Sequence, residues 1–178
     1  MKIYTKTGDD GNTGLQGNLR ISKSHPRIIS YGTVDEANAA LGIVLVNSLD
    51  DDISAILNKI QNDLFLVGAD LSNPNLNDVK NRVSLEMIKN LEQHIDKFEL
   101  ELPQLTNFIL PGGDPSAAQL HYVRTVVRRS ETLVVQLTEK DEINSNCIKY
   151  LNRLSDLLFV IARVINMRKG KKDILWNG

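Results

Sequence analysis

The chain has 178 residues, with 21 Lys and Arg against 22 Asp and Glu and a formal net charge of −1. This near balance gives no general attraction to nucleic acid or to anionic membranes. The length suits one domain, residues 1–178, around a single core. The one cysteine, Cys147, excludes an internal disulfide framework and a multi-cysteine metal site. Because no apolar signal core or bilayer-length apolar run is present, the expected location is cytoplasmic.

Residues 1–32 are polar, rich in glycine and short of periodic apolar positions. Glycines at such density allow positive φ and close backbone approach, so successive amides can surround phosphate oxygens. The segment matches neither the P-loop nor the G-x-G-x-x-G fingerprint. It is therefore either a nucleotide-binding segment or a flexible arm. Lys23, His25 and Arg27, which follow the glycines, are either ligand contacts or solvated charges.

Capping signals predict where the helices begin. Thr33 and Glu36 form a capping box for a first helix. Ser84 caps a third helix, and Asp114 caps a fourth that begins at about residue 115 with a proline in its first turn. Apolar periodicity places a second helix at about 52–71 and a fifth at about 146–169.

These five helices, short connections and no convincing strand pairs predict an all-α fold, a five-helix bundle preceded by an irregular glycine-rich segment. Val126 and Leu133 give the fourth helix a second apolar face, and the fifth helix is apolar nearly all round. Such faces need a partner to bury them. We therefore expect a homo-oligomer.

The fourth helix carries charges beside its core-facing stripe. Arg124, Arg128 and Glu131 recur at spacings of four and three, directly next to the leucines and valines of that stripe. Charges at the margin of a core are costly unless they pair or meet a charged ligand. Arginine forks match phosphate oxygens, so Arg124 and Arg128 can hold a triphosphate, with Asp35 or Glu131 fixing their rotamers.

Two other groups have open interpretations. On the fifth helix, Asn152, Asp156 and Arg163 line up with Phe159, which indicates either an interhelical hydrogen-bond network, the favoured reading, or a binding site. Arg82, just ahead of the third helix, can close over a phosphate chain or be an ordinary loop charge. The Glu-x-x-His pattern of di-iron bundles is missing, and no nucleophile triad has support. What remains is the binding of a polyanion.

Four blocks carry a family resemblance: KIYTKTGDDGNTGLQG, YGTVDEANAALG, FILPGG with AAQLHYVRTVVRRSE, and YLNRLSDLLFVIAR. In this order, over almost the whole chain, they resemble the ATP:cob(I)alamin adenosyltransferases of the trimeric five-helix-bundle (PduO-type) family. The resemblance implies transfer of the 5′-deoxyadenosyl group of ATP to cob(I)alamin, which forms adenosylcobalamin and releases triphosphate. It also implies a homotrimer with ATP sites between subunits and Mg²⁺ as a cofactor.

The resemblance also assigns residues. Asp35 is expected to pair across the subunit interface with Arg124, and Phe108 to stand below the corrin and displace the lower axial ligand. No residue is expected to ligate a metal ion. The positions implied around the nucleotide are Thr5, Thr7, Gly8, Asp9, Gly11, Thr13 and Lys23, with Arg82 as an addition, and those of the central site are Arg124, Arg128, Glu131 and Asn152.

The chain departs from the family pattern at Thr132, where a further basic residue is frequent. This change predicts at most a weaker peripheral contact. Two other functions stay open: a non-catalytic ATP-binding sensor or scaffold on the same bundle, and a phosphotransferase. A cobalamin reductase and an adenosylcobalamin-dependent enzyme are candidate partners, whereas nucleic acid and membranes are not expected.

Overall fold

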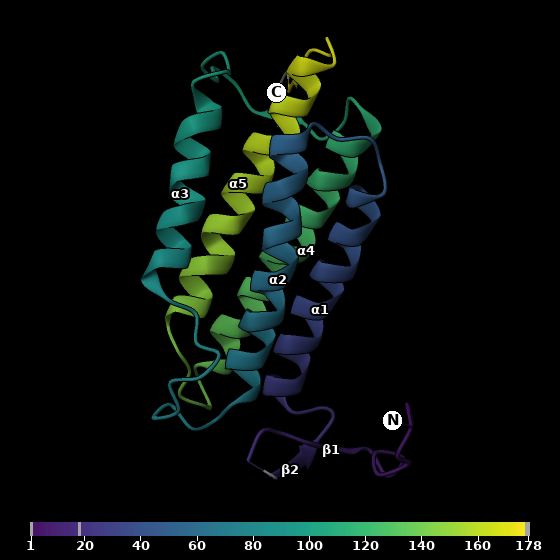
Figure 1. The fold of residues 1–178 in the computed structure, drawn as a ribbon, viewed down its shortest axis with the longest axis vertical. Helices are drawn as coiled ribbons and strands as arrows, with labels where there is room; N and C mark the ends of the chain where they lie inside the picture. The colour runs from purple at the N-terminus through teal and green to yellow at the C-terminus, as the bar shows by residue number, and fades with distance from the viewer. Residues whose placement is uncertain (1, 18, 177–178) are drawn as a thin grey trace.

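The computed structural model describes residues 2–17 and 19–176, and five helices make up most of this part of the chain (Figure 1). The all-α five-helix bundle is confirmed. The helices are α1 (Pro26–Leu45), α2 (Asp51–Ser72), α3 (Leu85–Glu99), α4 (Pro115–Leu137) and α5 (Asn146–Arg168).

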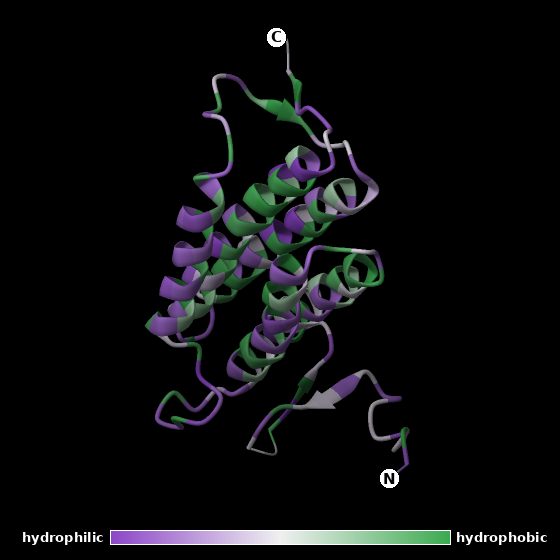
Figure 2. Cartoon of the chain, turned by 45° about the horizontal axis from the view of Figure 1, so that its top comes forward, coloured by the Kyte–Doolittle hydropathy of each residue, from purple (hydrophilic) through white to green (hydrophobic). Residues whose placement is uncertain are grey.

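Helix α5 lies at the centre of the packing. It contacts α4, α3 and α2, while α1 packs against both α4 and α2. This position explains why α5 is apolar nearly all round, with Leu151, Leu154, Leu157 and Leu158 completely buried. Helix α3 packs against α5, and its outer side is hydrophilic (Figure 2). None of the helices within the described residues is long and apolar enough to cross a membrane.

Helix α1 starts earlier than its sequence signals indicate. The backbone N–H of Arg27 donates to Nδ1 of His25, the N-cap, over 3.2 Å, and Pro26 takes the first helical position. The predicted start at Thr33 is wrong: the Thr33 hydroxyl donates to the carbonyl of Ile29 one turn back, over 2.9 Å. The irregular segment consequently ends at residue 25.

The other two predicted caps are confirmed. Ser84 Oγ accepts the backbone N–H of Met87 over 3.3 Å, and Asp114 Oδ1 accepts that of Ser116 over 2.9 Å. Each bond satisfies a donor that the first helical turn would otherwise leave free. Both helices therefore begin at the residues that their capping side chains predict.

Two short antiparallel strand pairs accompany the bundle, which the sequence did not predict. Strand β1 (Asn12–Gly14) pairs with β2 (Arg20–Ser22), and β3 (Ile109–Leu110) pairs with β4 (Ile174–Leu175). The first pair lies at the end of the bundle where α1 begins, and the chain's C-terminus lies at the other end (Figure 1). The glycine-rich segment and the Phe108 region thus occupy opposite ends of the bundle.

Candidate functional site

Arg124 and Arg128 of α4 open on one cavity. Arg124 is half-buried and Arg128 is exposed, one helical turn apart. The cavity has a volume of about 550 Å³ and lies between α3, α4 and α5. Besides the two arginines, its polar walls are Glu92, Asp96, Glu99, Arg153, Ser155 and Asp156.

The buried side of Arg124 needs a hydrogen-bond acceptor, whereas the cavity as a whole carries four carboxylates against three arginines. Burial lowers the pKa of the Arg124 guanidinium, and the like charge of Arg128 adds to the effect. Nε of Arg124 is buried and has no hydrogen-bond partner within the described residues. A buried donor without an acceptor is costly, so an oxygen supplied by a ligand or by another subunit would stabilise it.

Glu131 and Asn152 join α4 to α5 beside the arginines. Nδ2 of Asn152 donates to Oε1 of Glu131 over 2.9 Å, which supports the predicted interhelical network at this position. A second hollow of about 340 Å³ is lined by these two residues together with Arg128, Arg129 and Thr132. Arg128 therefore opens on both hollows and is the residue through which they meet.

The glycine-rich segment folds into a turn and a hairpin. The Thr5 and Thr7 hydroxyls are 2.8 Å apart, and positive φ angles of 60° at Lys6 and 83° at Gly11 reverse the chain. A Cβ added to Gly8 would lie 3.1 Å from Nζ of Lys23, so the lysine ammonium lies over this backbone. Hydroxyls and one ammonium, all of which can donate to phosphate oxygens, are thus brought together.

Asp9 and Thr13 belong to the same part of the chain: Asp9 is exposed in the turn, and Thr13 is half-buried on β1. Gln16 attaches the hairpin to the end of α2, because its Nε2 donates to the carbonyl of Ala69 over 3.1 Å and to Oγ of Ser72 over 3.0 Å. The segment is consequently docked on the bundle through a few polar contacts.

Asp35 is exposed on α1 and opens on a different cavity from Arg124. This cavity, of about 610 Å³, lies between α1, α2 and the hairpin, and Tyr31, Leu64 and Phe65 are among its walls. Within one subunit Asp35 and Arg124 are therefore not paired. The predicted ion pair between them requires a second subunit.

Arg27 and Arg82, both candidate ligand contacts, act as internal anchors. Arg27 is buried: its Nε pairs with Asp141 over 3.0 Å, and its Nη1 donates to the carbonyl of Leu71 over 2.8 Å. It is thus neither a solvated charge nor placed to meet a ligand.

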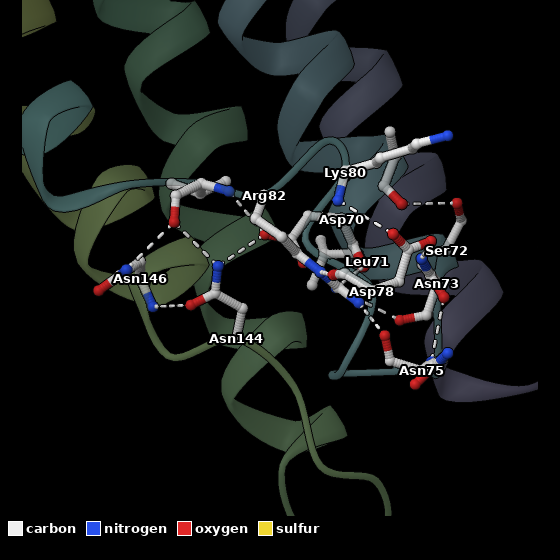
Figure 3. Close-up of polar contacts among 12 residues, drawn as sticks. Asp70, Leu71, Ser72, Asn73, Asn75, Asp78, Lys80, Arg82, Asn144 and Asn146 are labelled. Carbon is white, nitrogen blue, oxygen red and sulfur yellow. Dashed lines mark hydrogen bonds and ion pairs between the residues drawn. The ribbon is translucent and has the colours of Figure 1, made fainter.

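Arg82 lies in a dense polar cluster (Figure 3). Its guanidinium binds the buried carboxylate of Asp70 and the carbonyls of Asp78 and Asn75. Asp70 also accepts the backbone N–H of Val83 and Nδ2 of Asn144, each over 2.7 Å. The cluster ties the end of α2 to the following loop and to the start of α5.

Phe108 is 81% exposed just before β3. The Pro-Gly-Gly break behind it is fixed by Asn166 of α5, whose Nδ2 donates to the carbonyl of Gly112 over 3.0 Å and whose Oδ1 accepts the N–H of Asp114 over 2.8 Å. Gly113 has φ of 101°, and a Cβ there would lie 2.1 Å from Oδ1 of Asn166. Only glycine fits at this position.

His121 is a buried residue that sequence reasoning passed over. It is 3% exposed, its ring meets that of Phe159 edge-to-face at 5.9 Å, and neither ring nitrogen has a partner within the described residues. Burial lowers the pKa of the imidazole, and Arg124 lowers it further. The available signal was its spacing, one turn before Arg124 on the inner side of α4.

Comparison with known proteins assigns the family. A family model described as cobalamin adenosyltransferase matches residues 3–165. The chain belongs to this family. Corrinoid adenosyltransferases from Mycobacterium tuberculosis and Bacillus subtilis are each 44% identical to it over 98% of the chain, which corresponds to 92% and 91% of their own lengths.

Solved structures agree with this assignment to the cobalamin adenosyltransferases. A variant PduO-type ATP:corrinoid adenosyltransferase from Lactobacillus reuteri, complexed with cobalamin and ATP, has a TM-score of 0.93 and 37% identity, covering 99% of this chain and 100% of that one. Another variant of the same enzyme, complexed with ATP, has a TM-score of 0.92 and 36% identity, with 98% and 100% coverage.

The described residues contain no group of three or more His, Cys, Asp and Glu side chains arranged to hold a metal ion. Most of the positions that the resemblance assigns fall into three places. Arg124, Arg128, Glu131 and Asn152 lie together midway along the bundle, the glycine-rich segment lies at one end, and Phe108 lies beside the C-terminal strand at the other. One subunit brings together the central residues but not the two ends.

Proposed function

We propose that this chain transfers the 5′-deoxyadenosyl group of ATP to the cobalt of cob(I)alamin, releasing triphosphate. The proposal rests on Arg124 and Arg128, which line one cavity of a chain that belongs to the cobalamin adenosyltransferases. Nε of Arg124 is a buried donor without a partner within the described residues. Relatives of known structure hold ATP and cobalamin. A polyanion at the arginines supplies the acceptors that the isolated subunit lacks.

The reaction needs no nucleophile from the protein. The cobalt(I) substrate attacks the 5′ carbon, a cobalt–carbon bond forms, and the carbon–oxygen bond to the triphosphate breaks with its electron pair leaving on oxygen. Arg128, exposed at the junction of two hollows, is placed to stabilise the charge on the leaving group. Nδ2 of Asn152 holds the carboxylate of Glu131 over 2.9 Å, and both residues line the same hollow as Arg128, which fixes the local geometry.

The site is completed by a second subunit of a homotrimer. Within one chain, Asp35 and Arg124 open on separate cavities and do not pair. The predicted pair would therefore form between Asp35 of one subunit and Arg124 of its neighbour. The nucleotide segment would then come from the same subunit as Asp35, since the hairpin and Asp35 line one cavity. Its residues Thr5, Thr7, Gly8, Asp9, Gly11, Thr13 and Lys23 would surround the phosphates. The engagement of Arg82 with Asp70 makes it a support of this site instead of a phosphate contact.

Magnesium fits this site as a companion of the phosphates. Mg²⁺ is commonly held by one or two carboxylates together with substrate phosphates, and does not need a protein cage. The ion would share the charge of the triphosphate with Arg128.

Phe108 would act on the corrin. An exposed aromatic ring before a rigid turn can occupy the lower face of the macrocycle and keep the lower nitrogen ligand of cobalamin off the cobalt. Cobalt(II) without its lower ligand is easier to reduce, so the protein tunes the metal without ligating it. A cobalamin reductase would deliver the electron, and an adenosylcobalamin-dependent enzyme would accept the product.

Anaerobic incubation with ATP, Mg²⁺ and chemically reduced cobalamin tests the proposal. We expect the absorbance change of cobalt–carbon bond formation together with intact triphosphate as product. A sensor or scaffold would bind ATP with no spectral change above the protein-free control. ADP or pyrophosphate as the product would instead identify a phosphotransferase.

Arg128→Ala should lower kcat while leaving a folded oligomer, because losing a charge partner of a leaving group costs about 2.7–4 kcal/mol. Lys149→Ala is the control, because Lys149 is an exposed cation on α5 that lines neither hollow. Steady-state kinetics of both variants decide the role. Near-normal turnover of Arg128→Ala would remove Arg128 from the site.

A further inference from the structure

The C-terminal strand places an aromatic side chain against Phe108. Strand β4 pairs with β3 in the register Ile109 opposite Leu175 and Leu110 opposite Ile174. The next pair is completed by the backbone N–H of Trp176, which donates to the carbonyl of Phe108 over 2.7 Å. The two rings meet edge-to-face, with centroids 6.4 Å apart and planes at 69°. Aromatic pairs favour this geometry.

The base of this strand is fixed by buried polar contacts. Asp173, which immediately precedes β4, pairs with Nε of Arg163 over 2.8 Å and accepts Nδ2 of Asn166 over 3.4 Å. Asn166 is also the residue that holds the Pro-Gly-Gly turn on the other side. The turn that follows β3 and the residue that precedes β4 are therefore both held by the same turn of α5. These contacts fix the position of Trp176 relative to Phe108.

Phe108 has little else to hold its ring. The side chain is 81% exposed, and an exposed ring changes rotamer rapidly when no neighbour limits it. Within the described residues, Trp176 is the aromatic partner of Phe108. We propose that Trp176 is a positioning residue, which holds the Phe108 ring in the orientation that occupies the lower face of the corrin. This inference rests on the proposed role of Phe108.

The oxidation state of cobalt determines which step depends on Trp176. Cobalt(II) in cobalamin keeps its lower nitrogen ligand, and displacing that nitrogen makes the one-electron reduction to cobalt(I) easier, so that a weak reductant is sufficient. Cobalt(I) binds no lower ligand, so Phe108 has nothing left to displace once the metal is reduced. Loss of the positioning residue should therefore slow adenosylation from cob(II)alamin and spare the reaction of cob(I)alamin that is reduced beforehand.

The test compares full-length Trp176→Ala and Trp176→Phe with wild type in two assays. One supplies cob(II)alamin with a reduced flavin, and the other supplies cob(I)alamin made with a strong chemical reductant. We expect Trp176→Ala to lose about tenfold or more in kcat in the first assay and less than about twofold in the second. Trp176→Phe should recover most of the loss, because it restores an aromatic edge. Leu100→Ala, which removes an 89% exposed apolar side chain at the end of α3, is the control and should be unchanged in both.

A spectroscopic measurement supports the kinetics. Electron paramagnetic resonance of bound cob(II)alamin with ATP shows how much has lost its lower nitrogen, and this fraction should fall in Trp176→Ala and return in Trp176→Phe. The double variant with Phe108→Ala should be no slower than Phe108→Ala alone, since Trp176 acts through Phe108. If Trp176→Ala does not fold, Trp176→Leu, which keeps apolar bulk without a ring, takes its place.

Two results would overturn the inference. Equal losses in both assays would make Trp176 a direct corrin contact or a folding element, and no loss in either would show that Phe108 orients itself. Failure of the wild type to form a cobalt–carbon bond even from cob(I)alamin is a separate outcome, which would overturn the proposed function and not only the part played by Trp176.

Discussion

Replacing Arg82 with alanine separates a structural role from a role in ATP binding. The family resemblance places Arg82 near the nucleotide, whereas its guanidinium is occupied by the carboxylate of Asp70 and by loop carbonyls (Figure 3). The Asp70 side chain is 1% exposed and that of Arg82 is 14% exposed. Arg82→Ala would therefore leave a buried carboxylate without its cation.

The structure sets the size of the effect. Removing one partner of a buried ion pair destabilises a protein by about 3–5 kcal/mol. Asp70 would keep two donors, the N–H of Val83 and Nδ2 of Asn144, so the lower end of the range applies, about 3 kcal/mol. For a chain of this length that corresponds to a fall in Tm of roughly 6–12 °C.

Thermal unfolding and ATP titration together test this reasoning. Lys80→Ala is the matched control, because Lys80 is an exposed cation in the same loop. All variants must be compared at one protein concentration, since an oligomer unfolds in a concentration-dependent way. We expect a large fall in Tm for Arg82→Ala only. An unchanged Tm with strongly weakened ATP binding would refute the anchor role and restore Arg82 to the nucleotide site.

Two further predictions concern the other end of the bundle and α4. Gly113→Ala should cost about 3 kcal/mol in unfolding free energy, from a strained φ and displaced Asn166 bonds, whereas Gly170→Ala, at φ of 68° with open space, should cost only about 1 kcal/mol. Equal costs in denaturant titrations would contradict this. Because burial lowers the pKa of His121 below 6.5, the unfolded chain binds the proton more tightly, and stability should fall as pH drops below about 6.5. His94, with a lowered pKa too, adds to this fall, so His121→Phe should flatten it only in part, and an unchanged slope would count against the assignment.

Local signals predicted the helices well where the cap is a standard side chain. Ser84 and Asp114 act within three residues, so their sequence context contains the whole interaction. The start of α1 was missed because its cap is the ring of His25, which is not a standard capping side chain, and because the capping box at Thr33 and Glu36 indicated a later start. A capping box inside a helix, as at Thr33, is indistinguishable from one at its start.

Contacts between residues far apart in the chain could not be predicted from the sequence. The pairing of Arg82 with Asp70 depends on a chain reversal between them, and that of Phe108 with Trp176 joins strands too short to show any periodicity. The arginines of α4 were found because a charge beside an apolar stripe is visible in the sequence itself. Asn166 gave no such signal, since a polar residue in an apolar helix does not reveal what it binds.

The chain's one tryptophan lies beside Phe108, at the opposite end of the bundle from the glycine-rich segment. Light absorbed selectively by tryptophan therefore reports on a single location. A corrinoid that reaches Phe108 would quench this emission, because corrin rings absorb where tryptophan emits, whereas ATP does not absorb at these wavelengths. Stopped-flow fluorescence of the unlabelled protein can thus resolve the order in which the two substrates arrive.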